Sequence, residues 1–190
     1  ADAVRFLDAG KHVLVEKPMA LSAAGADTIF AAAETNDRFA MEAMWMRFSP
    51  GPVAGVAAVA AGAIGTPERL DIDFTIQVPT DPHHRLRSHE KGGGALLDLG
   101  IYPVTLAWWL LGPPTSWTVD GNVADGVDTR CVIDATWGAA TARLSCGLDE
   151  TGPLSATLTG ADGVVTMAAP FHAAERVIVT GTETGHPAAS

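Results

Sequence analysis

Residues 12–18, His-Val-Leu-Val-Glu-Lys-Pro, are the stretch that decides the fold of this 190-residue chain. The middle of this stretch is short, continuously apolar and rich in β-branched residues, which is typical of a strand buried on both faces of a parallel sheet. Residues 2–9 before it repeat apolar side chains at helical spacing and end at Gly10, where a helix C-cap belongs. We therefore predict a helix that leads into a parallel strand over residues 12–16.

The segments after this strand continue the alternation of helices and strands. Ser22 is suited to cap a helix over residues 23–33, residues 39–44 form a second buried-strand candidate, and Pro50 precedes an Ala-rich helix that reaches residue 63. This order predicts βαβ connectivity and a doubly wound parallel (Rossmann) sheet. Such a domain carries a Gly-rich phosphate loop after its first strand, and the chain contains no Gly-x-Gly-x-x-Gly.

The pattern changes after Gly65, where a second layer begins. Residues 70–78 alternate polar and apolar side chains, as in a sheet with one covered face, and an apolar helix over residues 95–111 follows a loop. The remaining strand candidates are residues 118–123, 130–137, 142–146, 155–159 and 164–167. We predict a partial Rossmann domain over residues 1–65 and, over residues 66–190, an α+β domain with a large, mainly antiparallel sheet that is incomplete at its C-terminus.

Composition and charge exclude several kinds of partner. The chain carries 12 Lys and Arg against 22 Asp and Glu, a net charge of −10, so nucleic acid and anionic membranes are not expected partners. The longest apolar stretch, residues 54–64, is shorter than a membrane span, and the first residues do not resemble a signal peptide. Two cysteines cannot form a disulfide framework. We expect a cytoplasmic protein.

The cysteines and histidines do not predict a metal site. Cys131 and Cys146 are symmetric about a turn at residues 138–139 and could face each other across a hairpin, most simply as reduced thiols. His83, His84 and His89 lie in a Pro- and Arg-rich loop with no cysteine and no helical i, i+4 pair, so we expect no metal. The mouth of a substrate pocket is the alternative place for these histidines.

Two motifs contain residues suited to chemistry. Glu16-Lys17-Pro18 follows a predicted parallel strand, at the edge where open α/β sheets bind ligands. The alternative, structural interpretation of this motif is a charged strand end followed by a turn-forming proline. Asp98 and Tyr102 lie four residues apart and share one face of an otherwise apolar helix. They need polar partners or a function, and the alternatives are a buried Asp–Tyr hydrogen bond or an acid that stabilises the helix start.

These motifs carry a family resemblance. Glu-Lys-Pro at residues 16–18, Met-Glu-Ala-Met-Trp-Met-Arg-Phe at 41–48 and Gly-Gly-Gly-Ala-Leu-Leu-Asp-Leu-Gly-Ile-Tyr at 92–102 occur in the order seen in the Gfo/Idh/MocA oxidoreductases. The chain resembles this family over essentially its whole length. The resemblance implies hydride transfer between NAD or NADP and a CH–OH group of a sugar, inositol or cyclic diol. Tyr102 stands where many relatives have His, which resembles the branch of glucose-fructose oxidoreductase and dihydrodiol dehydrogenases.

The resemblance also implies roles for individual residues. Tyr102 would be the principal acid and base, with Lys17 as its electrostatic partner and as a ligand of the substrate oxygen. A free phenol with a pKa of about 10 is a poor base at neutral pH, and a nearby ammonium favours the phenolate. Asp98 would orient Lys17 or a substrate hydroxyl, while Glu16 and Pro18 would shape the nicotinamide pocket.

Trp45 and Arg47 follow the second predicted strand at its C-terminal edge. An indole can stack on a substrate ring, and a guanidinium can bind a cofactor phosphate or a substrate oxygen. We assign Trp45 to the substrate and Arg47 to the cofactor. The alternative, structural interpretations are that Trp45 is a core residue and that Arg47 forms a surface salt bridge.

Two alternatives to an active enzyme remain at this point. A non-catalytic homologue could bind nucleotide or sugar as a regulatory protein, although it would not need Lys17, Asp98 and Tyr102 together. The chain also reads as an N-terminally truncated fragment, because the Gly-rich loop is missing, and such a fragment could be inactive although its parent is not. A homo-oligomer that pairs through the late antiparallel sheet is a further expectation.

Overall fold

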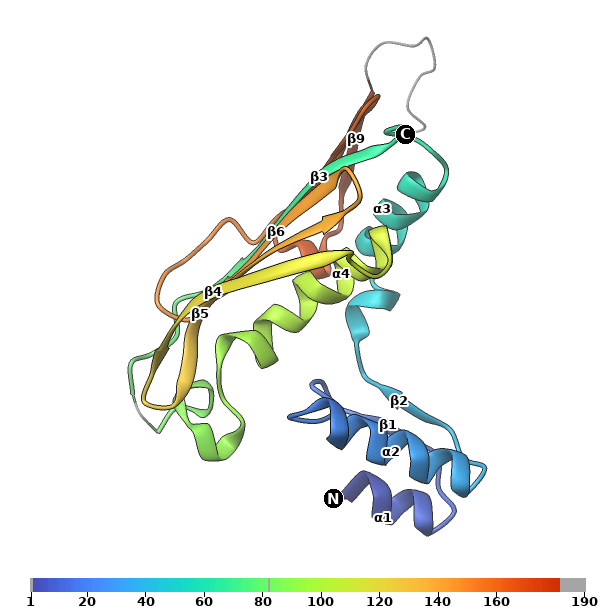
Figure 1. Ribbon diagram of the computed structural model, residues 1–190, viewed down its shortest axis with the longest axis vertical. Helices are drawn as coiled ribbons and strands as arrows, with labels where there is room; N and C mark the ends of the chain where they lie inside the picture. Colours follow the sequence, from blue (N-terminus) through green and yellow to red (C-terminus); the bar gives the residue numbers. More distant parts are fainter. Residues whose placement is uncertain (1, 82, 182–190) are drawn as a thin grey trace. The chain divides into compact units, whose positions relative to one another are not determined.

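The computed structural model describes residues 2–81 and 83–181 and divides the chain into two compact units, residues 1–45 and 46–190 (Figure 1). The division comes earlier than the boundary near residue 65 that the sequence predicted. The reason is helix α3 (Pro50–Ala60), which packs against α4, β8 and β9 of the second unit. Its Ala-rich sequence gave no sign of which sheet it would cover.

The first unit contains the predicted helices and strands in the predicted order. They are α1 (Asp2–Asp8), β1 (Val13–Val15), α2 (Ala23–Thr35) and β2 (Ala40–Glu42). The side chain of Ser22 accepts a hydrogen bond of 3.1 Å from the backbone N–H of Gly25, so it caps α2 as predicted. Strands β1 and β2 pair in parallel, with Val13 opposite Ala40.

Strand β1 is not buried on both faces, so this part of the prediction is wrong. Val13 and Val15 pack against a small core under α1 and α2, whereas Leu14 points to the opposite face and is 66% exposed. The core consists of Leu7, Met19, Ile29 and Ala33. Among the described residues the sheet has only two strands, and both helices pack on the Val13 side, so Leu14 has no cover.

The second unit is built on a seven-stranded mixed sheet in the order β4-β5-β6-β3-β7-β8-β9 (Figure 1). Its strands are β3 (Pro67–Thr75), β4 (Ser116–Ala124), β5 (Val127–Trp137), β6 (Ala140–Gly147), β7 (Ala156–Gly160), β8 (Gly163–Met167) and β9 (Val177–Gly181). Five neighbouring pairs are antiparallel, and β3 and β6 are parallel. The sheet is therefore mainly antiparallel, as predicted.

Cys131 and Cys146 lie directly opposite each other on β5 and β6, as the symmetry about the turn predicted. Both are free, buried cysteines. Burial raises the pKa of each thiol, because it disfavours the charged thiolate.

One face of this sheet is covered by α3 and by α4 (Ile101–Leu111), which lie side by side (Figure 1). The apolar rows of β3 and its neighbours face these helices, and the core includes Leu70, Ile72, Leu106, Leu144, Leu158 and Met167. The helical stretch His89–Leu111 is long and apolar enough to cross a membrane by those two measures, but 44% of its most apolar window is buried inside the protein. Its packing is that of a core helix.

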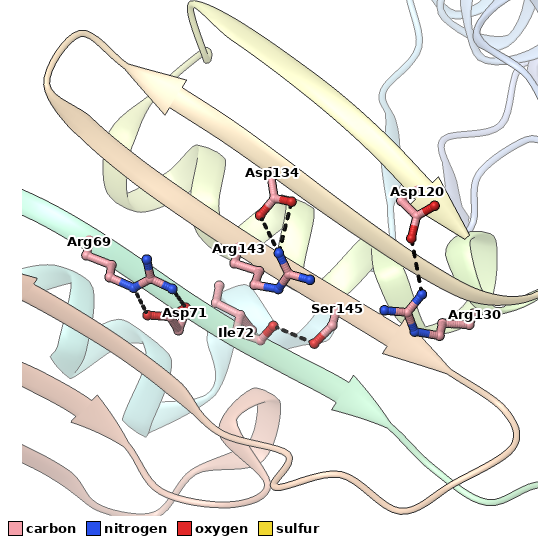
Figure 2. A network of polar contacts seen from close by, with 8 residues as sticks. All are labelled: Arg69, Asp71, Ile72, Asp120, Arg130, Asp134, Arg143 and Ser145. Atoms are coloured by element: carbon pink, nitrogen blue, oxygen red, sulfur yellow. Dashed lines mark hydrogen bonds and ion pairs between the residues drawn. The ribbon is translucent and has the colours of Figure 1, made fainter. Parts of the chain in front are cut away.

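The opposite face of the sheet carries a network of paired charges (Figure 2). The Arg143 guanidinium donates to both carboxylate oxygens of Asp134 at 3.0 Å, and Arg69 holds Asp71 through two hydrogen bonds of 2.6 Å. Ser145 Oγ donates to the backbone oxygen of Ile72 at 3.3 Å. These groups come from three adjacent strands, so this face presents a polar surface.

Candidate active site

Asp98 and Tyr102 are both buried at the start of the helix that covers the second sheet. They are 8% and 5% exposed, respectively. The prediction of one regular helix over residues 95–111 needs a correction, because Leu96–Gly100 form a π-helical turn before α4 begins. A π turn within a helix is rare and frequently marks a functional site. Asp98 lies within this turn, and Tyr102 is the second residue after it.

The start of this helix is anchored by Asp128, at the beginning of β5. Its carboxylate oxygen Oδ2 accepts a hydrogen bond of 2.6 Å from the backbone N–H of Leu96. A carboxylate at a helix N-terminus satisfies an unpaired N–H group and interacts favourably with the helix dipole. Gly94 has a φ of +118°, and a Cβ atom there would overlap the Asp128 carboxylate. The turn that carries Asp98 is thus fixed by a close backbone approach that only glycine permits.

Replacing Gly94 by alanine is therefore expected to destabilise the protein more than the same change at Gly62. Gly62 also has a positive φ, +80°, but a Cβ atom there would meet nothing within 4 Å. Both substitutions should lower the free energy of unfolding by about 1–3 kcal/mol, because alanine strains the backbone at a positive φ. Gly94→Ala adds about 0.5–2 kcal/mol, because it displaces the Asp128 cap. Denaturant unfolding of the two variants measures the difference.

A double-mutant cycle checks this account of the helix start. In an Asp128→Ala background the carboxylate is absent, so Gly94→Ala should cost no more than Gly62→Ala. An equal cost of Gly94→Ala with and without the Asp128 carboxylate would contradict the close contact.

Asp98 has a partner that the sequence did not reveal. Arg85 Nη2 donates to Asp98 Oδ1 at 3.1 Å, and the Arg85 side chain is 59% exposed. Its loop is held in place by Arg87, which donates to the backbone oxygens of Val78 and Leu148 at 3.1 Å and pairs with Asp149 at 2.7 Å. Arg85 thus places a cationic side chain beside Asp98. Its loop has no periodicity, so no sequence signal distinguished this arginine from its neighbours.

Aromatic rings from two other segments lie against Tyr102. The Phe74 ring, near the end of β3, and the His172 ring, in the short turn Phe171–Ala173, each have their centroid 5.2 Å from that of Tyr102. His172 also stacks on Phe74, with 4.3 Å between centroids and 14° between planes. The sequence analysis did not single out His172, because a lone histidine after a strand carries no motif.

The first unit contains the second candidate motif. Glu16, Lys17 and Pro18 directly follow β1, at the C-terminal edge of the two parallel strands, and the Lys17–Pro18 peptide bond is cis. Glu42, the last residue of β2, accepts a hydrogen bond of 2.7 Å from the backbone N–H of Met19. This bond ties the turn after β1 to the end of β2. Lys17 and Pro18 are half-buried, and Glu16 is exposed.

Trp45 and Arg47 follow β2 in the 3-10 turn Trp45–Phe48. The Trp45 side chain is 43% exposed, so the alternative of a core tryptophan is wrong. The Arg47 guanidinium lies over the indole ring of Trp109 in α4, 5.3 Å from its centroid. This cation–π contact holds Arg47 against the covering helix of the second unit.

The structure thus groups the candidate residues by unit. Asp98 and Tyr102 lie together in the second unit, where Arg85 and His172 join them. Arg47, in the same unit, contacts Trp109 on another part of α4. The first unit contains the remaining candidates, Glu16, Lys17, Pro18 and Trp45.

Comparison with known proteins gives matches over nearly the whole chain. A family model described as the GFO/IDH/MocA C-terminal domain matches residues 56–184, and one described as an oxidoreductase family with an NAD-binding Rossmann fold matches residues 2–44. A trans-1,2-dihydrobenzene-1,2-diol dehydrogenase from Danio rerio is 30% identical over 96% of this chain and 55% of the relative. A D-xylose 1-dehydrogenase (NADP(+)) from Hypocrea jecorina is 37% identical over 52% of this chain and 27% of the relative.

Solved structures share the fold. An aldose-aldose oxidoreductase from Caulobacter crescentus, complexed with glycerol, superposes with a TM-score of 0.84 at 24% identity, covering 100% of this chain and 60% of that one. A levoglucosan dehydrogenase complexed with NADH and levoglucosan has the same TM-score at 18% identity, covering 98% and 54%. The chain spans about half the length of the curated dihydrodiol dehydrogenases that it matches.

Proposed function

The chain belongs to the Gfo/Idh/MocA oxidoreductase family, and from this membership we propose that its protein is an NAD(P)-dependent dehydrogenase or reductase. The reaction is hydride transfer between nicotinamide and the CH–OH carbon of a sugar, an inositol or a cyclic diol. One observation carries the proposal: Asp98 and Tyr102 are both buried at the helix start that the family motif marks. A module that only binds ligands has no need of this acid and phenol.

The first unit fits the nicotinamide end of such a cofactor. Dinucleotides bind at the C-terminal edge of parallel strands, where Glu16, Lys17 and Pro18 follow β1 and Glu42 ends β2. The hydrogen bond from Met19 to Glu42 gives this edge a defined backbone. Residues 1–190 contain no Gly-rich phosphate loop and no residue that selects NAD over NADP, so both cofactors belong to the proposal. We assign Arg47 to the cofactor as well.

The residues divide the chemistry as follows. Bound nicotinamide supplies the hydride acceptor or donor. Tyr102 removes the hydroxyl proton during oxidation and returns it during reduction. Lys17 binds the substrate oxygen and favours the Tyr102 phenolate through its positive charge. Asp98 orients Lys17 or a neighbouring substrate hydroxyl, and Arg85 pairs with that carboxylate.

Trp45 and the polar face of the sheet are assigned to contacts with the substrate and with a second subunit. The exposed Trp45 indole offers a flat apolar surface on which a sugar or diol ring can stack. The polar face that carries Arg69, Asp71, Asp134 and Arg143 is suited to pair with a second copy of the chain, which supports a homo-oligomer (Figure 2). The two buried free cysteines accord with a reducing, cytoplasmic location.

Nicotinamide binding tests the proposal before any substrate is known. NADH and NADPH are titrated, with nucleotide fluorescence as the readout, into residues 1–190 and into the full-length protein. We expect the full-length protein to bind at least one nucleotide, and binding to residues 1–190 to be much weaker, because the phosphate contacts of a Rossmann domain come from its Gly-rich loop. If the full-length protein binds neither nucleotide, the dehydrogenase proposal fails, and the alternative hypothesis of a regulatory binding protein takes its place.

A further inference from the structure

The exposed side chain of Arg85 lies directly beside the buried carboxylate of Asp98. Arg85 Nη2 donates to Asp98 Oδ1 at 3.1 Å, and the Arg85 side chain is 59% exposed whereas that of Asp98 is 12% exposed. Water screens an ion pair whose cation is this exposed, so the pair contributes little to stability. Stability alone therefore does not explain a long cationic side chain at this carboxylate.

The loop that carries Arg85 is packed onto the glycine-rich segment that precedes the helix of Asp98. The backbone N–H of Gly94 donates to the backbone oxygen of Leu86 at 3.0 Å, and Leu86 is 5% exposed. The backbone of Gly93 lies so close to the carbonyl oxygens of Arg85 and Leu86 that a Cβ atom would overlap both. The backbone of Arg85 is thus held beside the helix start, while its guanidinium stays exposed.

The Arg85 guanidinium has hydrogen-bonding capacity left for a ligand. A guanidinium carries five N–H donors in a rigid, planar arrangement. Within residues 2–81 and 83–181, the only hydrogen-bond acceptor of the Arg85 side chain is Asp98 Oδ1. The remaining donors are therefore available to an oxygen atom of a substrate that binds beside Asp98.

The charges around Arg85 favour a neutral hydroxyl over a carboxylate as this ligand. Asp98 compensates the charge of Arg85, so the pair carries no net charge. The other cations of the loop have different partners: Arg87 pairs with Asp149 at 2.7 Å, and Lys91 Nζ donates to a backbone oxygen of the loop at 3.0 Å. A carboxylate bound to Arg85 would be repelled by the like charge of Asp98. A hydroxyl oxygen accepts the same hydrogen bond without this repulsion.

We propose that Arg85 binds a second hydroxyl of the substrate, adjacent to the one that Tyr102 deprotonates, a role that rests on the proposed function. Asp98 and Tyr102 lie four residues apart at one helix start, and Cβ atoms at this spacing in a helix are about 5–6 Å apart. A sugar or diol ring that presents one hydroxyl to Tyr102 therefore reaches the Arg85–Asp98 pair with the next. The substrate class is accordingly a vicinal diol, because an isolated alcohol lacks the second contact.

Deoxy analogues of the substrate test this role in the full-length protein. For a sugar or diol that the wild-type protein oxidises, kcat and KM are measured with the parent compound and with analogues that lack a hydroxyl next to the reacting one. We expect the wild-type kcat/KM to fall about tenfold for one of these analogues, the effect of losing a hydrogen bond to a charged donor. In Arg85→Met this difference should disappear, because neither compound then meets the donor.

The ratio of kcat/KM between parent and analogue separates substrate binding from a purely structural role. If Arg85 only held Asp98 in place, Arg85→Met would slow both compounds equally and leave the ratio unchanged, which would overturn the proposal. Arg85→Lys keeps a charge and a donor beside Asp98, so it should retain part of the discrimination. Lys91→Met is the matched control, because it removes a cation from the same loop and should keep the wild-type ratio.

The outcomes also distinguish this role from the proposed function. If the wild-type protein oxidises a sugar or diol but discriminates against no analogue, the role of Arg85 is overturned while the dehydrogenase stands. A preference for the corresponding sugar acid that Arg85→Met abolishes would identify a carboxylate as the ligand and would equally overturn it.

If the wild-type protein shows no hydride transfer, the proposed function fails instead. Calorimetric titration with the same sugars and diols then decides on Arg85. An affinity about tenfold lower in Arg85→Met than in the wild type would support the binding role, whereas equal affinities, or no binding to either protein, would overturn it.

Discussion

Replacing Tyr102 by phenylalanine is expected to reduce the maximal rate of hydride transfer by about 10²–10⁴-fold, the typical contribution of a general acid or base. The change removes one hydroxyl and keeps the ring that packs beside Phe74 and His172. The affinity for NADH should not change, because Tyr102 is not among the residues assigned to the cofactor. Rates measured at saturating substrate, together with a nucleotide titration, separate the two effects.

The control for this variant lies on the same helix. Val104 is 39% exposed in α4 and has no proposed role in the chemistry, so Val104→Ala should retain the wild-type rate. A Tyr102→Phe protein with the wild-type rate and an unchanged fold would show that the phenol is not the acid or base.

Replacing Lys17 by methionine should cause the second large loss, at least tenfold in the rate of oxidation. The variant removes the ammonium that favours the phenolate, so the phenol holds its proton more tightly. The sign of the pH effect follows directly: the pH at which oxidation becomes fast should move to higher values. Rates measured across a pH series on the full-length protein test this expectation.

Two further lysine variants test whether the positive charge at residue 17 is the cause of these effects. Lys17→Arg retains a positive charge, so its pH profile should remain closer to that of the wild type, although the different shape of the guanidinium lowers the rate. Lys11 is an exposed lysine shortly before β1, and Lys11→Met should change neither the rate nor the profile. A Lys17→Met profile that overlays the wild-type profile would exclude Lys17 as the electrostatic partner of the phenol.

The elements of the fold that depend on local sequence were predictable. The Ser22 cap, the apolar run of β1 and the alternation along β3 each specify their element through neighbouring residues. Partners distant in the sequence were less visible. The alternation along β3 is compatible with either strand direction, so its parallel pairing with β6 could not be deduced. The uncovered face of β1 likewise depends on which elements surround the strand.

The candidate site likewise contains residues that the local sequence identified and residues that only the tertiary structure identifies. Asp98 and Tyr102 were found because they share a face of a periodic helix and belong to a motif. The π turn that contains Asp98 could not be predicted, because Leu96–Gly100 has an ordinary apolar helical composition. Arg85, Asp128 and His172 reach the site from a loop, a strand and a short turn. Only the tertiary packing brings these side chains to the helix, so no local pattern could identify them.

The measurement that tests the central claim most directly is nicotinamide reduction by the full-length protein, followed by absorbance with a panel of sugars, inositols and cyclic diols. The account predicts that at least one of these alcohols is oxidised with NAD or NADP, and that Tyr102→Phe abolishes the signal while it still binds the nucleotide. Nucleotide-dependent oxidation that continues at the wild-type rate in Tyr102→Phe, or no binding of either nucleotide by the wild type, would contradict it.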